Sequence, residues 1–176
     1  DMTINQGSNK LAIDWNSFDI GAGNSVTFAQ PSSKAVALNR VTGGDASAIL
    51  GNLNANGQVF LVNPNGILFG KSASVNVGGL VASTLDLPVA EFNKGNYQFK
   101  GNGAPGAVVN QGKLTAADGG AVALLGGSVS NQGVIVANQG TVALAAGNAM
   151  TLDFAGDGLL SVQVDESVAN ALAENQ

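Results

Sequence analysis

A chain of 176 residues is long enough to bury a sizeable core and short enough to form a single domain. Its 7 Lys and Arg residues against 12 Asp and Glu residues give a formal net charge of −5, which argues against binding along a nucleic-acid backbone. The chain contains neither His nor Cys, so Ser-His-Asp and Cys-His catalysis, zinc fingers and disulfide bonds are all excluded. A low charged fraction of 11% and 25 glycines indicate small side chains stacked in a regular structure.

The first segment, residues 1–31, contains Trp15, Phe18 and Phe28 and does not fit the repeat found later in the chain. We expect it to cap the first coil of a repeating fold, because an exposed strand edge invites aggregation. Its first ten residues lack the basic start and apolar stretch of a secretory signal. No apolar run reaches the roughly 18 to 20 residues that span a bilayer. The sequence therefore predicts a soluble, processed chain.

Residues 39–70 place turn residues at regular intervals among short aliphatic runs. Asn63–Gly66, reading Asn-Pro-Asn-Gly, suits a type I turn, in which Asn caps its own backbone and Pro pre-sets the φ of the second position. Asn39–Val41, reading Asn-Arg-Val, contains the only arginine of the chain. Its planar guanidinium can hold a carboxylate or backbone carbonyls in fixed geometry. From residue types alone, these motifs are a corner of the fold and a surface ion pair.

Residues 86–107 interrupt the regular spacing of turns and short strands, because they cluster two prolines with Phe92, Tyr97 and Phe99. We interpret the stretch as a hairpin that leaves the main structure and packs against its side.

A repeat of 20 to 21 residues follows. Asn-Gln-Gly occurs at Asn110–Gly112 and again 21 residues later at Asn131–Gly133, and Gly120–Leu124 returns 20 residues later as Gly140–Leu144. Within each repeat, strands of about four to six residues alternate apolar with small or polar side chains and are divided by Gly and Asn turns. Three short strands in such a period are the pattern of a parallel β-helix.

The predicted fold is therefore all-β, a right-handed parallel β-helix (solenoid) formed by a single domain over residues 1–176. It comprises an N-terminal cap at 1–31, an extra-helical hairpin at 86–107 and regular coils of about 20 to 21 residues over 108–176. In this arrangement Val122 stacks over Val142, and Leu124 over Leu144. At a strand spacing of roughly 4.8 Å, about seven or eight coils would form a rod roughly 35 Å long.

The densest acidic group consists of Asp153, Asp157, Asp165 and Glu166. A β-helix lyase would need a basic residue beside calcium-binding acids, but from Gln111 onward the only cation is Lys113. The stretch 155–158 is weakly similar to a calcium-binding loop, but it supplies one Asp where Ca²⁺ requires several oxygen ligands. We predict that the protein is not an enzyme and has no catalytic residues, no metal site and no cofactor.

Three motifs in order, Asn39–Val41, Ala55-Asn56-Gly57 and Val62–Gly66, resemble the signature of a known family. It is the amino-terminal secretion domain of two-partner-secretion exoproteins, the filamentous-haemagglutinin-like group. The interruption at 86–107, with its Phe-x-x-Gly-x-Tyr-x-Phe pattern, is also similar to this family. Some relatives carry an additional Asn-Pro-Asn-Leu motif, of which this chain has no clear copy.

The resemblance implies a secretion domain of a large exported adhesin-like protein. The periplasmic domains of an outer-membrane barrel transporter would recognise it, and it would nucleate β-helix folding at the surface of a Gram-negative bacterium. It implies a secreted or cell-surface location, a monomer, and no nucleic-acid or small-molecule partner. The residues that it assigns to transporter recognition are Asn39, Arg40, Val41, Asn63, Pro64, Asn65 and Gly66. The alternative is an adhesive β-helix that binds a host glycan or protein directly. Such a surface would need a large apolar or aromatic outer patch, and aromatic residues outside 86–107 are too few to suggest one.

Overall fold

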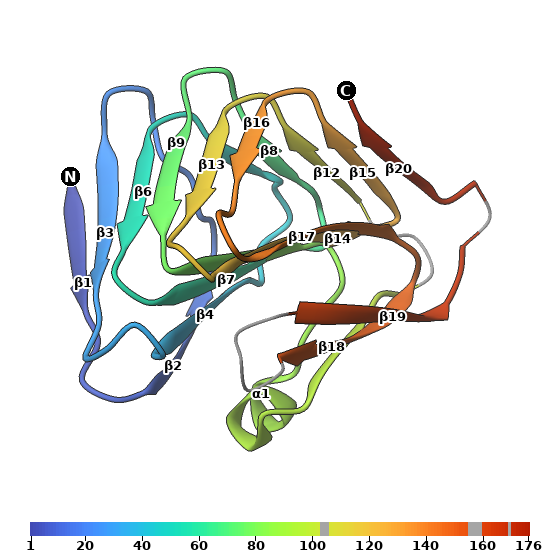
Figure 1. Cartoon of the computed structure of the whole chain (residues 1–176), viewed down its shortest axis with the longest axis horizontal. Coiled ribbons are helices and arrows are strands. Elements are labelled where there is room, and N and C mark those ends of the chain that lie inside the picture. The colour runs from blue at the N-terminus through green and yellow to red at the C-terminus, as the bar shows by residue number, and fades with distance from the viewer. Residues whose placement is uncertain (103–105, 155–159, 169) are drawn as a thin grey trace.

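The computed structural model describes residues 1–102, 106–154, 160–168 and 170–176, which form a parallel β-helix with an additional layer on one side (Figure 1). The first sheet contains, in spatial order, β1 (Met2–Asn5), β3 (Ser25–Ala29), β6 (Asn52–Ala55), β9 (Ser74–Val77), β13 (Lys113–Ala116) and β16 (Val134–Val136). The second contains β2 (Lys10–Trp15), β4 (Val36–Val41), β7 (Gln58–Val62), β10 (Gly79–Ser83), β14 (Ala121–Gly126) and β17 (Thr141–Ala146). The third contains β5 (Ser47–Ile49), β8 (Ile67–Phe69), β12 (Ala107–Asn110), β15 (Ser128–Asn131) and β20 (Leu172–Asn175). The predicted fold class is confirmed.

Like residues stack in register inside the helix. Leu53, Val75 and Leu114 are consecutive partners in the first sheet, and all three are fully buried. Each such burial contributes about 1.5 to 3 kcal/mol. The two predicted pairs, Val122 with Val142 and Leu124 with Leu144, are both present between β14 and β17. These stacked apolar residues, continued from coil to coil, hold the strands in one register.

The solenoid is shorter than the repeat length suggested. The two longest sheets contain 6 strands among the described residues. Five strand spacings of roughly 4.8 Å give a length of about 24 Å. The difference arises because residues 86–100 and 149–166 contribute chain length outside the coils.

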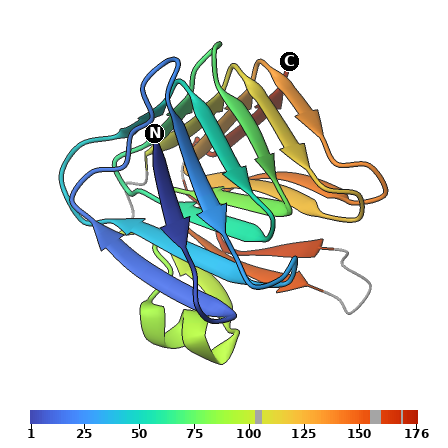
Figure 2. The same ribbon diagram turned by 90° about the vertical axis from the view of Figure 1, so that its left-hand side faces the viewer.

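Residues 1–31 are more regular than expected. They supply β1, β2 and β3, which pair in parallel with the strands of the next coils. Figure 2 looks onto this end, where β1 and β2 are the edge strands of their sheets. The segment expected to be a cap therefore supplies the terminal coil of the solenoid, because its strands pair in parallel with those of the coils that follow.

The extra-helical region also differs from the expected hairpin. It begins with helix α1 (Val89–Lys94), which starts after Pro88 and ends at Gly95 in the left-handed conformation, φ 77°. Strand β11 (Tyr97–Lys100) then pairs antiparallel with β18 (Ala149–Phe154), and β18 pairs with β19 (Leu160–Glu166). Residues 149–166 thus leave the coils in which the repeat placed them. We call α1, β11, β18 and β19 together the cover layer.

The cover layer makes a second hydrophobic core with the outer face of the second sheet, below that sheet in Figure 1. Phe60 is at its centre, with its ring centroid 6.1 Å from that of Phe92, 5.3 Å from Tyr97 and 6.2 Å from Phe154. Burial in this cluster raises the pKa of the Tyr97 hydroxyl above its usual value of 10.0. Strands β4, β7, β10 and β14 are therefore buried on both faces, which explains their nearly continuous apolar sequences.

Candidate functional site

The two motifs assigned to recognition lie at one corner, where the second sheet turns into the third. Asn39 and Arg40 on β4 are register partners of Leu61 and Val62 on β7, so the motifs belong to adjacent coils. The Asn65 side chain ties the turn to the segment just after the first motif, since its Nδ2 donates a hydrogen bond to the Gly43 carbonyl at 2.8 Å. The fold thus brings together residues that are more than twenty positions apart in the chain.

Asn63 holds this corner from the inside. Its side chain is fully buried, with Nδ2 donating to the Asp45 carbonyl and to Ser47 Oγ, each at 3.0 Å. Its Oδ1 accepts from the Asn65 backbone N–H at 3.0 Å, which is the expected capping of its own turn. The Gly66 N–H donates to the Asn63 carbonyl at 3.1 Å and closes the turn. The predicted corner is therefore present, and Asn63 is its structural centre.

The other residues of this turn divide between surface and interior. Pro64 and Asn65 are exposed, whereas Gly66 is buried with φ at 128°, a backbone conformation that glycine adopts without strain. The Pro64 carbonyl accepts a hydrogen bond from the Gly106 N–H at 3.2 Å. The turn therefore presents the Pro64 ring and the Asn65 side chain to solvent.

Two residues of the other motif point into the solenoid. Asn39 is fully buried, and its Oδ1 accepts from Trp15 Nε1 at 2.9 Å while its Nδ2 donates to the Phe60 carbonyl at 3.3 Å. Val41 is part of the inner hydrophobic core. Neither side chain is accessible to a partner of the folded domain.

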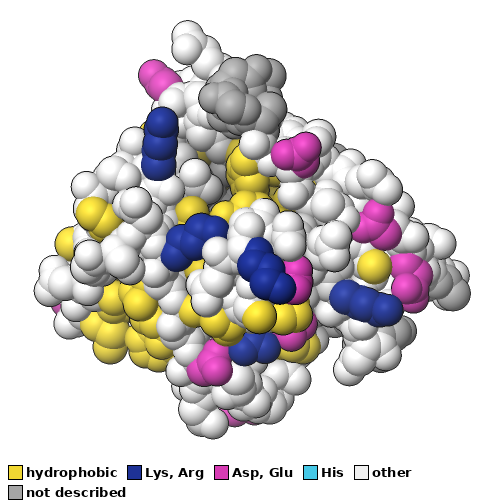
Figure 3. Space-filling model, turned by 90° about the horizontal axis from the view of Figure 1, so that it is seen from below, with side chains coloured by type: hydrophobic (Ala, Val, Ile, Leu, Met, Phe, Trp, Pro, Cys, Tyr) yellow, Lys and Arg dark blue, Asp and Glu magenta, His cyan; other side chains and the backbone are white. Residues whose placement is uncertain are grey.

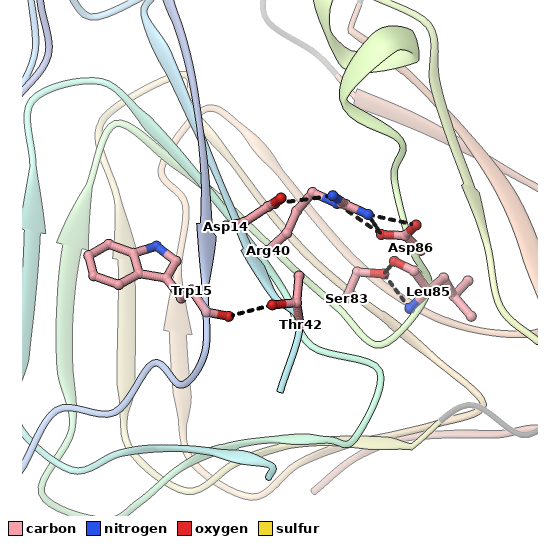
Figure 4. A network of polar contacts seen from close by, with 7 residues as sticks. All are labelled: Asp14, Trp15, Arg40, Thr42, Ser83, Leu85 and Asp86. Atoms are coloured by element: carbon pink, nitrogen blue, oxygen red, sulfur yellow. Dashed lines mark hydrogen bonds and ion pairs between the residues drawn. The ribbon is translucent and has the colours of Figure 1, made fainter. Parts of the chain in front are cut away.

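Arg40 points outward and is more than an isolated surface pair (Figure 4). Its Nη1 lies 3.1 Å from Asp14 Oδ1 on β2, and its Nε and Nη2 bind the Asp86 carboxylate at 3.1 Å. Asp86 lies between β10 and α1, so Arg40 joins two coils to the segment that leads into the cover layer. Because the Asp14 and Asp86 side chains are 55% and 41% exposed, solvent screens these pairs and limits their energy.

A shallow open groove runs past this corner. Its lining includes Arg40, Thr42, Pro64, Asn65, Asp86 and Lys100. Thr42, Asp86 and Lys100 also line the groove but were not predicted as neighbours of the motifs. Asp86 and Lys100 are joined through their backbones, each N–H donating to the other's carbonyl at 3.0 and 2.9 Å, a pairing that no local sequence signal indicates. The groove therefore combines both motifs with the start and end of the α1–β11 excursion.

The acidic residues considered for catalysis do not form a metal cluster in the part of the chain that the structure describes. Asp165 accepts hydrogen bonds from Thr151 Oγ1 at 2.6 Å and Gln163 Nε2 at 2.8 Å, and Glu166 accepts from Asn148 Nδ2 at 2.9 Å. Over the described ranges, no group of three or more His, Cys, Asp or Glu residues could hold a metal ion. Asp157 and the stretch 155–158 lie outside these ranges. The described helix is also too short to cross a membrane.

A family model described as the TPS secretion domain matches residues 1–176, the whole chain. The chain belongs to the TPS secretion domain family. This TPS domain is 55% identical over 98 residues to a heme/hemopexin-binding protein of Haemophilus influenzae, covering 56% of this chain and 11% of that protein. It is 48% identical over 115 residues to the heme/hemopexin-binding protein of the Rd strain, covering 64% of this chain and 13% of that one.

Among solved structures, the crystal structure of the HMW1 secretion domain from Haemophilus influenzae matches with a TM-score of 0.76 and 32% sequence identity. The match covers 93% of this chain and 46% of that chain. The TPS domain thus spans only a small part of the curated relatives that it matches. These comparisons confirm the resemblance inferred from the motifs and favour a secretion domain over a directly adhesive module.

Proposed function

We propose that this TPS domain directs a longer exported protein to an outer-membrane transporter, whose periplasmic domains recognise it. TPS exoproteins are exported across the outer membrane of Gram-negative bacteria, so the product would be secreted or held at the cell surface. The observation that supports the proposal is that two separate signature motifs lie on adjacent coils at one corner, beside an open groove. We expect the domain to act as a monomer, without a cofactor, and not as an enzyme.

The burial of the signature residues favours recognition of an extended chain. In the folded domain, only Arg40, Pro64 and Asn65 reach the surface, whereas Asn39, Val41, Asn63 and Gly66 are buried. An extended chain presents all seven residues to a partner. The folded β-helix would then be the product of export, formed outside the cell.

Folding outside the outer membrane supplies a physical driving force for export where ATP is absent. At roughly 0.05 to 0.15 kcal/mol of net stability per residue, each coil of about 21 residues contributes perhaps 1 to 3 kcal/mol. A coil that has folded outside does not slide back, so each added coil biases movement outward.

The transporter-dependent role is tested by Pro64→Ala. Placed behind a signal peptide with its partner transporter, this variant should appear in the medium severalfold less than the parent, because it removes an exposed ring and leaves the carbonyl that binds Gly106. Its free energy of unfolding, measured by thermal denaturation, should change by less than about 1 kcal/mol. Lys71→Ala, exposed at another corner, serves as the control and should be released normally. Release that is equal without the transporter would refute the proposed function.

Recognition of an extended chain is tested by a cross-link. Thr27 and Asn54 are register partners on β3 and β6. Paired Cα atoms lie about 4.8 Å apart, within the roughly 4.4 to 6.8 Å that a disulfide spans. Because the native chain has no Cys, the double variant Thr27→Cys/Asn54→Cys forms a single defined bond. We expect its oxidised form to remain in the periplasm and its reduced form to be released, as should Thr27→Cys alone. Equal release of the oxidised form would contradict recognition of a fully extended chain.

A further inference from the structure

Two asparagines of the signature motifs are each followed by a glycine. The chain contains three Asn-Gly pairs, and the structure describes both residues of two of them, Asn56-Gly57 and Asn65-Gly66. In an unfolded chain, the backbone nitrogen of the residue after Asn can attack the side-chain carbonyl carbon of that Asn. Glycine hinders this attack least, because it has no Cβ and its backbone rotates freely. Asn-Gly is therefore the pair at which an unfolded chain loses its side-chain amide fastest.

The fold requires glycine at both positions. A Cβ on Gly57 would lie 2.7 Å from the Ala35 carbonyl oxygen and 2.8 Å from Gln30 Oε1, which is too close for a side chain. At Gly66 the backbone φ is 128°, a conformation that glycine adopts without strain. A larger residue that slows the reaction in the unfolded chain would thus disturb the folded one, so protection of these pairs has to come from folding itself.

Hydrogen bonds fix both reacting groups of the first pair in the folded domain. The Gly57 N–H, whose nitrogen would attack, donates to Gln30 Oε1 at 2.7 Å. The Asn56 side chain bonds to the neighbouring coil, where its Oδ1 accepts from the Gln30 N–H and its Nδ2 donates to the Gln30 carbonyl, each at 2.8 Å. Gln30 is buried, and its Nε2 donates to Gln6 Oε1 at 3.1 Å. Attack at Asn56 therefore requires that these contacts first open.

The second pair is held in a similar way at the corner. The Gly66 N–H donates to the Asn63 carbonyl at 3.1 Å. The Nδ2 of Asn65, the atom that would leave as ammonia, donates to the Gly43 carbonyl at 2.8 Å and to Asn63 Oδ1 at 3.1 Å. Asn56 and Asn65 are both exposed to solvent, yet each is restrained by contacts that an unfolded chain lacks.

We propose that Asn56 and Asn65 are sites of spontaneous deamidation in the unfolded chain, and that folding of the domain closes both. The glycine nitrogen forms a bond to the Asn Cγ, the Cγ–Nδ2 bond breaks, and ammonia leaves with the proton of the glycine N–H. Water then opens the five-membered imide at either carbonyl and gives aspartate or isoaspartate. The inference rests on the proposed function in one respect, because recognition of an extended chain keeps both pairs open until export.

The products cannot rebuild the contacts of these turns. Aspartate at position 56 replaces the donor to the Gln30 carbonyl with a carboxylate oxygen, so two acceptors face each other. Aspartate at position 65 does the same toward the Gly43 carbonyl and Asn63 Oδ1. Isoaspartate also lengthens the backbone by one carbon atom within a tight turn. Deamidation before export would thus lower the share of chains that fold, which makes the time spent unfolded a limit on productive export.

The experiment compares the full chain folded in buffer with the same chain unfolded in urea, at one pH and temperature. Peptide mass spectrometry follows the amide loss at Asn56 and Asn65. Each event also adds one negative charge to a surface on which charged side chains are scattered among uncharged ones, as Figure 3 shows from below, so ion exchange resolves the products.

We expect both sites to react in urea and to react at least about tenfold more slowly in the folded chain, the factor given by a local opening free energy of about 1.4 kcal/mol. Synthetic peptides of residues 52–60 and 61–70, incubated with and without urea, are the control for any effect of urea on the chemistry. Equal rates in the folded and unfolded chains would overturn the proposal.

Variants then separate the chemistry from its effect on folding. In urea, where folding plays no part, Gly66→Ala should slow the reaction at Asn65 severalfold and leave Asn56 unchanged. Asn56→Asp and Asn65→Asp, which carry one product in advance, should unfold at lower urea concentrations than the parent. Asn76→Asp adds the same charge at an exposed position of the first sheet and should behave like the parent.

The unfolded parent, aged until both sites have reacted, should refold in lower yield than the fresh chain. Full refolding of the aged chain, together with unchanged stability of both product variants, would refute the proposed effect on folding. A reaction at Asn65 that Gly66→Ala does not slow would refute the proposed chemistry. These measurements use the purified chain without a transporter, so their failure leaves the proposed function standing. That function fails instead if release is equal without the transporter.

Discussion

Replacing Phe60 with alanine is expected to lower the free energy of unfolding by about 3 to 5 kcal/mol, the usual loss when a buried Phe is truncated. The Phe60 ring is fully buried and is shared by the second sheet and the cover layer, where it contacts Phe92, Tyr97 and Phe154. A single-domain protein has only about 5 to 15 kcal/mol of stability in total, so this is a large fraction. Urea unfolding followed by circular dichroism measures it.

Leu68→Ala is the control for this prediction. Leu68 is only partly buried and points outward from β8, where the described structure places no covering layer. Its truncation should cost about 1 kcal/mol or less. Equal losses at the two positions would show that the cluster around Phe60 does not stabilise the domain.

Asn63→Ala should lower the free energy of unfolding by about 3 kcal/mol, because buried polar groups left unsatisfied cost about 1 to 3 kcal/mol each. The variant removes the partners of the Asp45 carbonyl, Ser47 Oγ and the Asn65 N–H, all at one corner. Chemical denaturation of the purified variant measures the change. Its hydrogen exchange should rise first at β5 and β8, which this corner joins.

Asn76→Ala provides the matched control. Asn76 is exposed on the first sheet, and its side chain donates to the Oγ of Ser74, at 3.2 Å. We expect a change within about 0.5 kcal/mol. A similarly small change for Asn63→Ala would contradict the structural role of that residue. If the predicted loss occurs, poor secretion of Asn63→Ala would not by itself assign recognition, which is why the exposed Pro64 is the sharper probe.

The 20- to 21-residue repeat could be predicted from the sequence because identical side chains stack on each other in successive coils. Asn110, Asn131 and Asn175 form a ladder in the third sheet, with Nδ2 to Oδ1 distances of 2.9 and 2.7 Å between successive side chains. Each of the first two also accepts from the N–H two residues later, in Gly112 and Gly133. Asn110 pairs with its copy 21 residues later, one coil period along the chain, so the pattern was visible in one sequence.

The cover layer was not predictable in the same way. Residues 149–154 alternate apolar and polar side chains like any coil strand, yet they pair antiparallel with β11. Local alternation does not distinguish a strand of the solenoid from one that crosses it, because both present one apolar face. Residues 1–31 are the opposite case: they form coil strands although Asn5–Gly7 is not repeated one coil period later.

For the candidate site, the motifs identified the corner turn and the only arginine, but not their contacts. The buried positions of Asn39 and Asn63 depend on which way each strand faces, and the Asp86 partner of Arg40 lies 46 residues away. Such long-range contacts leave no mark on local spacing.

The sequence by itself determined the class of the fold, the coil period, the stacking register of the later coils and the family. These properties depend on short-range patterns and on residues that repeat. The tertiary structure alone decided that the second sheet is covered on its outer face, that the two motifs meet at one corner, and which signature residues reach solvent. These features depend on contacts between segments tens of residues apart, whose partners are chosen by shape and burial and not by neighbouring residues in the chain.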